Sequence, residues 1–362
     1  MKTKIILAGG FLGSGKTTLL LKAAQMLGER GLRTGVITND QAPELTDSLL
    51  LRHEGLRVEE VSGSCFCCNY KAFAEAAQSL RRDSGAEIIL AEPVGSCTDL
   101  SATVVQPLKA YGAEDFAVAP LSVLVEPLRL AITLSSGATD FHEDAVYICR
   151  KQLEEADIIV ITHADKWDEQ AQENVRRTVA ENFPLASIHI VSSITGQGMD
   201  GWLDEVMSDK PSGRQIASVD YNRYAKGEAG LSWFNGTFFL HGEGVDWNQV
   251  AAELMKLLED ACDERNFAVG HVKLILENCE QYVMGNMTAM SSEILMRGSV
   301  DRVPDVRLTL NVRLECNPLF LEKTVQKSLG LVSKDKFVVE TVAWRCFSPS
   351  RPEPTYRFTE IV

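Results

Sequence analysis

The sequence has no long hydrophobic run. No apolar stretch reaches about 18 residues without a charge, so we expect no segment that crosses a membrane. A run of basic residues is missing as well, and 50 acidic side chains against 36 basic ones give a formal net charge of −14. Because a nucleic-acid backbone is bound through clustered cations, this charge argues against a nucleic-acid partner. We expect a soluble protein that binds neither membranes nor nucleic acids.

A second Cys-x-x-Cys pair, of the kind that closes many structural zinc sites, is also missing, and the 6 histidines show no ligand spacing among themselves. The chain nevertheless has 9 cysteines, an odd number, and three of them lie close together at Cys65, Cys67 and Cys68. In a chain of this length such a cluster is typical of metal or thiol chemistry in a reducing compartment. We therefore expect a cytoplasmic location.

A chain of 362 residues is too long for one ordinary hydrophobic core. Its composition, 45% apolar and 24% charged residues, is that of a globular protein. We expect a larger domain over residues 1–209 and a smaller α+β domain over residues 230–362. The connection between them is placed at residues 210–229, where the pattern dissolves into Lys-Pro-Ser-Gly and polar residues.

The first part of the chain alternates short buried strands with helices. This order predicts an α/β fold with a mostly parallel sheet that is covered by helices on both faces. The predicted strands are residues 4–7, 34–38, 88–91, 117–125, 158–161 and 188–191, and the predicted helices include residues 17–27, 70–82 and 170–181.

The last part of the chain follows a different pattern. Apolar residues from Trp247 to Ala261 mark one face of a helix, and alternation over residues 308–314 predicts a strand with one exposed face. With strands over residues 233–240 and 337–344 and a second helix over residues 319–329, the order fits a βαββαβ sandwich.

A phosphate-binding loop lies between the first predicted strand and helix. The run from Gly10 to Thr17 fits G-x-x-x-x-G-K-[ST]. Its glycines let the backbone wrap the phosphates, Lys16 would reach the β- and γ-phosphates, and the Thr17 hydroxyl would bind Mg²⁺. The alternative is a glycine-rich turn with a chance lysine. The residues expected at the nucleotide are Gly10, Gly13, Ser14, Gly15, Lys16, Thr17 and Thr18. The motif predicts the P-loop NTPase class.

Three further residues are expected near the phosphates. Glu92 ends a predicted strand and would hold Mg²⁺; the weaker alternative is that it only ends a buried strand. Gly95 would offer its amide to the γ-phosphate and so sense hydrolysis. Asp40, after the second strand, is a candidate for orienting water or metal, or a solvated turn residue. Lys16, Asp40 and Glu92 form the predicted catalytic set.

The cysteine cluster falls between Asp40 and Glu92, the two segments that should respond to the γ-phosphate. Thiolates are soft ligands for Zn²⁺, Cu(I), Co²⁺ or Ni²⁺, and three so close together can supply most of a metal shell. The alternatives are unliganded buried thiols, a redox disulfide, and a closed structural zinc with a remote fourth ligand. Cys97 could approach the same pocket, but a lone cysteine is more often a small core residue.

These motifs together resemble those of one family. The segments Gly-Phe-Leu-Gly-Ser-Gly-Lys-Thr-Thr-Leu-Leu, Ser-Cys-Phe-Cys-Cys-Asn and Glu-Pro-Val-Gly, in this order, resemble the CobW/YjiA-like GTPases, relatives of the urease and hydrogenase nickel-insertion GTPases. The likeness covers about the first 210 residues. It implies GTP-gated binding of a transition metal at Cys65, Cys67 and Cys68, a client metalloprotein as acceptor, dimers in some members, and a ferredoxin-like accessory domain.

The sequence departs from the family where the base is recognised. Members usually carry Asn-Lys-x-Asp, whereas this chain has Thr162, His163, Ala164 and Asp165. Asp165 can still accept from the N1 and N2 donors of guanine, and Ser192 resembles part of the second base-contacting loop. We expect GTP, with weaker affinity or altered base preference.

The resulting hypothesis is a Mg²⁺-dependent GTPase that handles Zn²⁺, Co²⁺ or Ni²⁺. GTP would hold the metal-binding cysteines in a competent geometry, and hydrolysis would release it. Two alternatives stay open. The first is an assembly factor for a metal- or corrinoid-dependent enzyme, with a fixed zinc and nucleotide-controlled docking. The second is a small-molecule kinase, although we see no arginine-rich lid.

Overall fold

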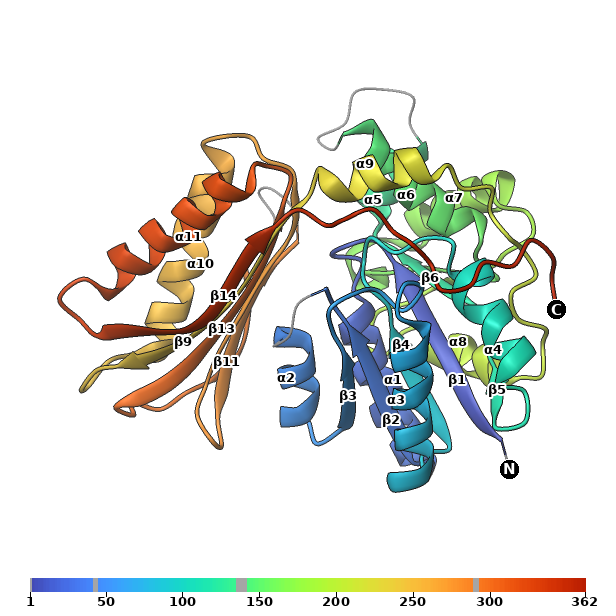
Figure 1. The fold of residues 1–362 in the computed structure, drawn as a ribbon, viewed down its shortest axis with the longest axis horizontal. Helices are drawn as coiled ribbons and strands as arrows, with labels where there is room; N and C mark the ends of the chain where they lie inside the picture. The colour runs from blue at the N-terminus through green and yellow to red at the C-terminus, as the bar shows by residue number, and fades with distance from the viewer. Residues whose placement is uncertain (1, 42–44, 135–141, 289–292) are drawn as a thin grey trace.

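The computed structural model describes residues 2–41, 45–134, 142–288 and 293–362. Two lobes are visible, and the C-terminal segment runs from the smaller lobe back across the larger one (Figure 1). None of the helices in these ranges is long and apolar enough to cross a membrane.

The larger lobe contains a parallel sheet, which confirms the predicted α/β fold. Its order within the described residues is β3-β2-β4-β1-β6-β7-β8, with β5 beside the start of β1. The strands are β1 (Thr3–Gly10), β2 (Thr34–Asn39), β3 (Arg57–Val61), β4 (Ile88–Glu92), β5 (Phe116–Val118), β6 (Ser122–Val125), β7 (Ile158–Ile161) and β8 (Ser187–Ile190).

Two strands differ from the prediction. The single strand expected over residues 117–125 is interrupted between β5 and β6, where Pro120 has no N–H to donate to the neighbouring strand. The edge strand β3 was not predicted because three of its five residues are charged, and a strand with one neighbour does not need two apolar faces.

Helices cover both faces of this sheet, as expected. Side chains of β1 point alternately to the two sides, so Ile5 and Leu7 join one hydrophobic cluster and Ile6 and Ala8 join the other. The second cluster includes residues of α1 (Lys16–Glu29), α2 (Thr46–His53) and α8 (Met199–Met207). The first includes residues of α3 (Tyr70–Asp83), α4 (Gln106–Tyr111), α5 (Pro127–Leu134), α6 (Glu143–Glu154) and α7 (Glu169–Asn182). This domain also contains a short π-helix, η1 (Ser101–Val105), and a short 3-10 helix, η2 (Ala164–Lys166).

The smaller lobe is an antiparallel sheet in the order β12-β11-β10-β13-β9-β14. Its strands are β9 (Ser232–His241), β10 (Val269–Glu277), β11 (Tyr282–Met287), β12 (Leu295–Ser299), β13 (Asp305–Leu314) and β14 (Val338–Phe347). The helices α10 (Trp247–Asp263) and α11 (Pro318–Ser333) pack against each other and against the sheet. The predicted βαββαβ order is present, but β11 and β12 extend it by two strands at the edge beside β10.

The prediction that one face of β13 is exposed was wrong. Leu308, Leu310 and Val312 face the core of the smaller lobe, but Asn311 and Arg313 on the other face are 2% and 0% exposed. The polar face is buried because it lies against the larger lobe, where the Asn311 side chain accepts hydrogen bonds from the amide and hydroxyl of Thr46.

Two segments join the lobes. Within residues 210–229, where the sequence predicts a connection, the structure forms α9 (Tyr221–Ala229), which packs on α6 and buries Tyr224. Residues 348–362 return across the larger lobe, and their backbone reaches the carbonyls of Cys67 and Ala102. Both lobes therefore contribute to the surroundings of the predicted sites.

Candidate functional site

The loop between β1 and α1 has the backbone conformation that a phosphate cradle needs. Gly10, Gly13 and Gly15 have φ angles of 131°, 78° and 89°, a region that favours glycine. A Cβ atom on Gly10 would lie 2.3 Å from the carbonyl oxygen of Leu124, so close packing also requires glycine there. The loop ends at the N-terminus of α1, whose free N–H groups favour an anion.

Lys16 is folded back over this loop. Its Nζ donates to the carbonyl oxygens of Gly10 at 2.9 Å and Phe11 at 3.2 Å, and the side chain is buried. Burial lowers the pKa of Lys16, while the nearby Glu92 carboxyl opposes this shift. A buried ammonium held only by carbonyl oxygens is placed to exchange them for phosphate oxygens.

Thr17 and Glu92 meet as the sequence predicts. The Thr17 hydroxyl donates to Glu92 Oε1 at 3.0 Å, while Glu92 Oε2 is buried without a hydrogen-bond partner among the described residues. Burial raises the pKa of Glu92 to about 7. A buried, under-coordinated carboxylate beside a threonine hydroxyl suits Mg²⁺, so these residues fit the ion.

One cavity brings together most of the predicted nucleotide residues. Its lining includes Gly13, Gly15, Lys16, Thr17, Thr18, Asp40, Glu92, Gly95, Asp165 and Ser192. The two residues predicted to contact the base lie together in this lining, where a hydrogen bond from the Ser192 side chain lowers the pKa of Asp165. Gly10 and Ser14 are not in its lining; Gly10 instead holds Lys16 through its carbonyl, and the Ser14 hydroxyl is buried in the loop.

The smaller domain supplies side chains that the sequence analysis missed. His271, Lys273 and Trp233 also line the nucleotide cavity. Lys273 Nζ lies 2.7 Å from both carboxylate oxygens of Asp47, and Arg313 Nη2 lies 2.7 Å from Asp40 Oδ2. The sequence contained one signal, the charged Arg313 in the polar face of β13. Its contact with Asp40 forms only when the two domains pack together.

Asn39, also missed, connects the nucleotide cavity to the cysteine loop. It lines the cavity, and its Nδ2 donates to the carbonyl oxygens of Val61 at 2.9 Å and Ser64 at 2.8 Å. Its Oδ1 accepts from the amide of Phe66 at 2.8 Å. The side chain of Asn39, at the end of β2, therefore holds the segment that leads to Cys65 and also Phe66, the residue between Cys65 and Cys67.

The predicted metal ligands lie together. The Sγ atoms of Cys65, Cys67 and Cys68 are all within 4.8 Å of one another, with 2.8 Å between the first two and 3.7 Å between the last two. Cys65 and Cys67 are buried, and Cys68 is half-buried. Hydrogen bonds from the neighbouring thiols, Cys67 first, hold the pKa of Cys65 well below its ordinary value. The hydrogen bond with Cys65 in turn raises the pKa of Cys67 and of Cys68, so the cluster favours one thiolate, at Cys65. A thiolate is the form that binds metal.

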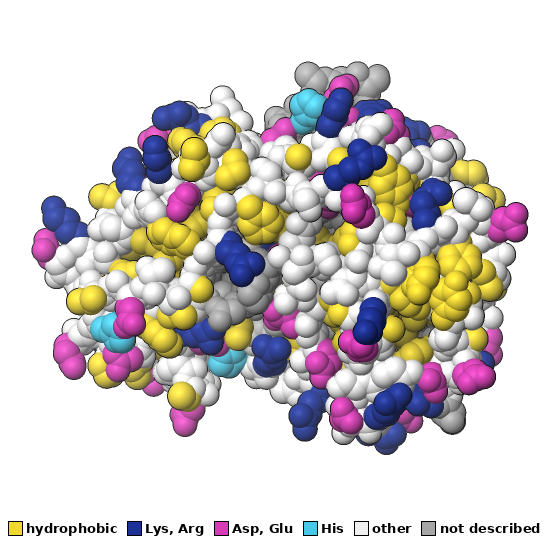
Figure 2. Space-filling view, viewed as in Figure 1, with side chains coloured by type: hydrophobic (Ala, Val, Ile, Leu, Met, Phe, Trp, Pro, Cys, Tyr) yellow, Lys and Arg dark blue, Asp and Glu magenta, His cyan; other side chains and the backbone are white. Residues whose placement is uncertain are grey.

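The C-terminal segment covers this cluster. The Glu353 amide donates to Cys68 Sγ at 3.2 Å, and the Thr355 amide donates to the Cys67 carbonyl at 2.8 Å. Nearby, the Tyr356 ring lies 5.2 Å from that of Tyr111. Hydrophobic side chains gather on this face, over α4 and the segment (Figure 2). We call residues 348–362 the strap.

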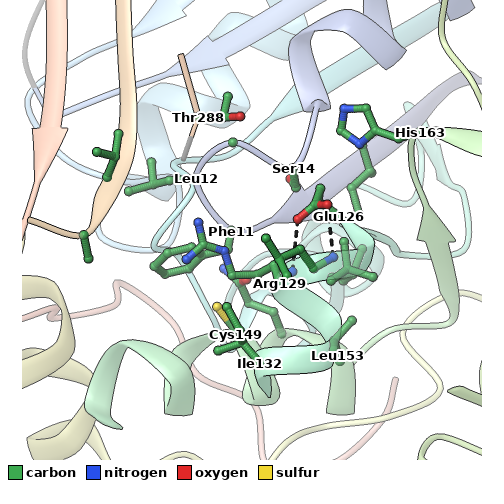
Figure 3. A pocket seen from close by; sticks show the side chains of 18 of the residues that line it. Phe11, Leu12, Ser14, Glu126, Arg129, Ile132, Cys149, Leu153, His163 and Thr288 are labelled. Carbon is green, nitrogen blue, oxygen red and sulfur yellow. Dashed lines mark hydrogen bonds between the residues drawn. The ribbon is translucent and has the colours of Figure 1, made fainter. Parts of the chain in front are cut away.

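A second cavity adjoins the other side of the phosphate loop (Figure 3). There Arg129 lies over the ring of Phe11, 5.3 Å from its centroid, near Cys149. Of the described residues that line it, none is Lys16 or Glu92. The triphosphate is therefore expected in the first cavity.

The chain matches a known protein family. A family model described as "CobW/HypB/UreG, nucleotide-binding domain" matches residues 4–189. The chain is similar to the zinc chaperone CobW of Pseudomonas aeruginosa, with 26% identity over 226 residues, 54% of this chain and 58% of that protein. It is also similar to the zinc chaperone YeiR of Escherichia coli, with 26% identity over 183 residues, 50% of this chain and 52% of that protein. The chain thus spans little more than half the length of these relatives.

Among solved structures, Zn(II)-bound YjiA GTPase from Escherichia coli aligns with a TM-score of 0.36 and 16% identity, covering 92% of this chain and 100% of that one. The hydrogenase maturation factor HypB from Archaeoglobus fulgidus aligns with a TM-score of 0.37 and 22% identity, covering 56% of this chain and 87% of that one. The family model, which matches half of the chain, confirms the resemblance seen in the sequence. The chain belongs to the CobW/HypB/UreG family of P-loop GTPases.

Proposed function

We propose that this protein hydrolyses GTP with Mg²⁺ and that its nucleotide state controls the binding of a transition metal at Cys65, Cys67 and Cys68. Zn²⁺ is the first candidate because two similar proteins are named zinc chaperones, and Co²⁺ and Ni²⁺ suit the same soft ligands. The metal is cargo, which a client metalloprotein accepts.

The arrangement around the phosphate loop supports the hydrolase half of the proposal. When bound, Mg²⁺ would lie at Thr17 and Glu92 and neutralise charge on the phosphates. Lys16 would leave the Gly10 carbonyl for the β- and γ-phosphates. The Asp40 carboxylate, held by Arg313, lines the same cavity and is a candidate to orient the attacking water.

The observation that carries the proposal is the position of Asn39. Its backbone ends β2 directly before Asp40, and its side chain fixes the loop of Cys65 to Cys68 through three hydrogen bonds. A displacement of this strand end on loss of the γ-phosphate would change the geometry of the cysteines. A ligand shifts such an equilibrium only through different affinities for its two states, so GTP and GDP must bind differently to the metal-loaded form.

The proposal is tested by two matched pairs of proteins. Phosphate release from GTP with Mg²⁺ is measured for the wild type and Lys16→Ala, and zinc content for the wild type and Cys67→Ser. We expect Lys16→Ala to abolish hydrolysis and Cys67→Ser to lose zinc while it still hydrolyses GTP. Zinc that no chelator removes in any nucleotide state would instead indicate a fixed structural site and an assembly-factor role.

A further inference from the structure

The smaller domain lies directly on the phosphate loop. A Cβ atom added to Gly13 would be 3.1 Å from the carbonyl oxygen of Gly270, near the start of β10, and 3.0 Å from Cβ of Thr288. Side chains along a strand alternate between its two faces, so His271 and Lys273 share one face of β10. Both residues line the nucleotide cavity. The strand β10 therefore brings Lys273 to the cavity in which the triphosphate is expected.

The helix α2 of the larger domain holds Lys273 in the wall of this cavity. Lys273 Nζ donates to both carboxylate oxygens of Asp47, in the first turn of α2, at 2.7 Å each. The two side chains are only 12% and 17% exposed. Asp47 also lines the nucleotide cavity, together with Lys16 and Glu92. The pair of Lys273 and Asp47 is therefore part of the wall that surrounds the predicted phosphate and magnesium ligands.

Further contacts fix α2, and with it the position of Lys273. At the start of α2 the amide of Thr46 donates to Asn311 Oδ1 at 2.9 Å, and at its end His53 Nε2 lies 2.6 Å from Glu277 Oε2. The smaller domain thus contacts α2 at both of its ends and between them. A charged group that is held in place before the reaction stabilises a transition state without a cost of reorganisation. Lys273 is a cation of this kind.

The hydrolysis of GTP calls for a second cation at the γ-phosphate. The oxygen of a water molecule bonds to the γ-phosphorus while the bond from that phosphorus to the oxygen bridging to the β-phosphate breaks, and GDP, phosphate and a proton leave. Charge in the transition state is spread over the γ-phosphate oxygens, where an added cation increases the rate. Of the described residues that line the cavity, Lys16 and Lys273 are the two with a lysine or arginine side chain.

We propose that Lys273 of the smaller domain is a catalytic residue that acts on the γ-phosphate of GTP. With GTP bound, its ammonium group exchanges Asp47 for oxygens of the γ-phosphate, and it returns to Asp47 after the phosphate leaves. Asp47 is a positioning residue that keeps the ammonium group in the cavity. The contact with the γ-phosphate exists with GTP and not with GDP, so the smaller domain senses the nucleotide state. This inference rests on the proposed function, because it requires GTP hydrolysis in this cavity.

The test measures phosphate release from GTP with Mg²⁺ in the full chain, as kcat and KM, together with the affinity for GDP. Lys273→Met removes the cation, and Lys273→Gln removes it but keeps a donor for Asp47. Asp47→Asn keeps the cation and weakens its pair. The matched control is Lys256→Met, which removes an exposed lysine of the same domain, 2.8 Å from Glu259. Unfolding curves show that each variant is folded.

We expect both Lys273 variants to lower kcat by about a hundredfold and to bind GDP as the wild type does, because GDP has no γ-phosphate. Asp47→Asn should lower kcat far less, and Lys256→Met should behave as the wild type. A wild-type kcat in Lys273→Gln, or equal losses in Lys273→Gln and Asp47→Asn, would overturn the inference, because the pair would then only join the domains. A wild type that releases no phosphate from GTP would instead overturn the proposed function itself.

Discussion

Arg313 of the smaller domain and Asp40 of the larger one form a buried ion pair at the nucleotide cavity. Nη2 and Oδ2 are 2.7 Å apart, and the Arg313 side chain is 0% exposed. The same guanidinium lies 4.2 Å from the ring centroid of Trp233. Charges this far from water are tolerated only as a pair, so the contact ties the smaller domain to the segment that follows β2.

Replacing Arg313 by methionine should therefore lower the free energy of unfolding by about 3–5 kcal/mol, because it removes the buried guanidinium that faces the Asp40 carboxylate. The exposed pair of Arg302 and Asp246, 3.2 Å apart, offers a matched control. Arg302→Met should change the free energy of unfolding far less, because water screens this exposed pair. Urea unfolding of both variants measures the difference, and equal effects would mean that the buried pair does not hold the domains together.

Much of the fold could be predicted because its elements have clear local signals. The strand β7 was predicted to the residue, since four β-branched residues lie between polar neighbours. The phosphate loop and Glu92 were placed by motif and by strand order. Asn39 and Arg313 were missed because each acts through a partner that only the tertiary structure brings near. A single asparagine or arginine carries no spacing pattern, so nothing local separates it from a packing residue.

We expect the base preference to depend on Asp165, because its carboxylate can accept from both donors of guanine. In Asp165→Asn, an amide replaces one acceptor by a donor, so binding of GTP should weaken by about tenfold or more. Xanthosine triphosphate carries a carbonyl where guanine carries a donor, so it should bind Asp165→Asn more tightly than it binds the wild type. Competition of both nucleotides, and of ATP, against a fluorescent analogue measures this. An unchanged GTP affinity would mean that Asp165 does not bind the guanine base.

Glu155 should make stability depend on pH. It is buried, and burial raises its pKa to about 8, with the nearby Asp99 carboxylate acting in the same direction. Between the ordinary value of 4.5 and about 8, the folded protein keeps a proton that the unfolded chain has released. The stabilisation is therefore complete below pH 4.5 and is lost as the pH rises through about 8.

In Glu155→Gln this loss should disappear, because glutamine does not titrate. Its amide oxygen still accepts from the Ser101 amide, which lies 2.7 Å from Glu155 Oε2. Across this window the free energy of unfolding of the wild type should fall by up to about 1.4 kcal/mol per pH unit more than that of the variant. Urea midpoints at pH 5 and pH 8 provide the comparison. Parallel pH profiles for the two proteins would show that Glu155 is ionised in the folded state.

The strap should limit access to the cysteines. Removing residues 348–362 deletes the hydrogen bonds of Thr355 to the carbonyl oxygens of Cys67 and Cys68. Each bond contributes about 1 kcal/mol, so the free energy of local opening around Cys67 and Cys68 should fall by about 2 kcal/mol. The opened state should then be populated about thirtyfold more. Mass spectrometry after brief alkylation should show faster modification of Cys68. The exposed Cys279 serves as an internal control and should react at the same rate in both proteins.

The central claim is that nucleotide and metal affect each other's binding. Its most direct test is the Zn²⁺ affinity of one preparation, measured by competition with a chelator in the presence of Mg²⁺ and either a non-hydrolysable GTP analogue or GDP. The account predicts at least about fivefold tighter binding with the analogue. Equal affinities in the two nucleotide states would contradict it.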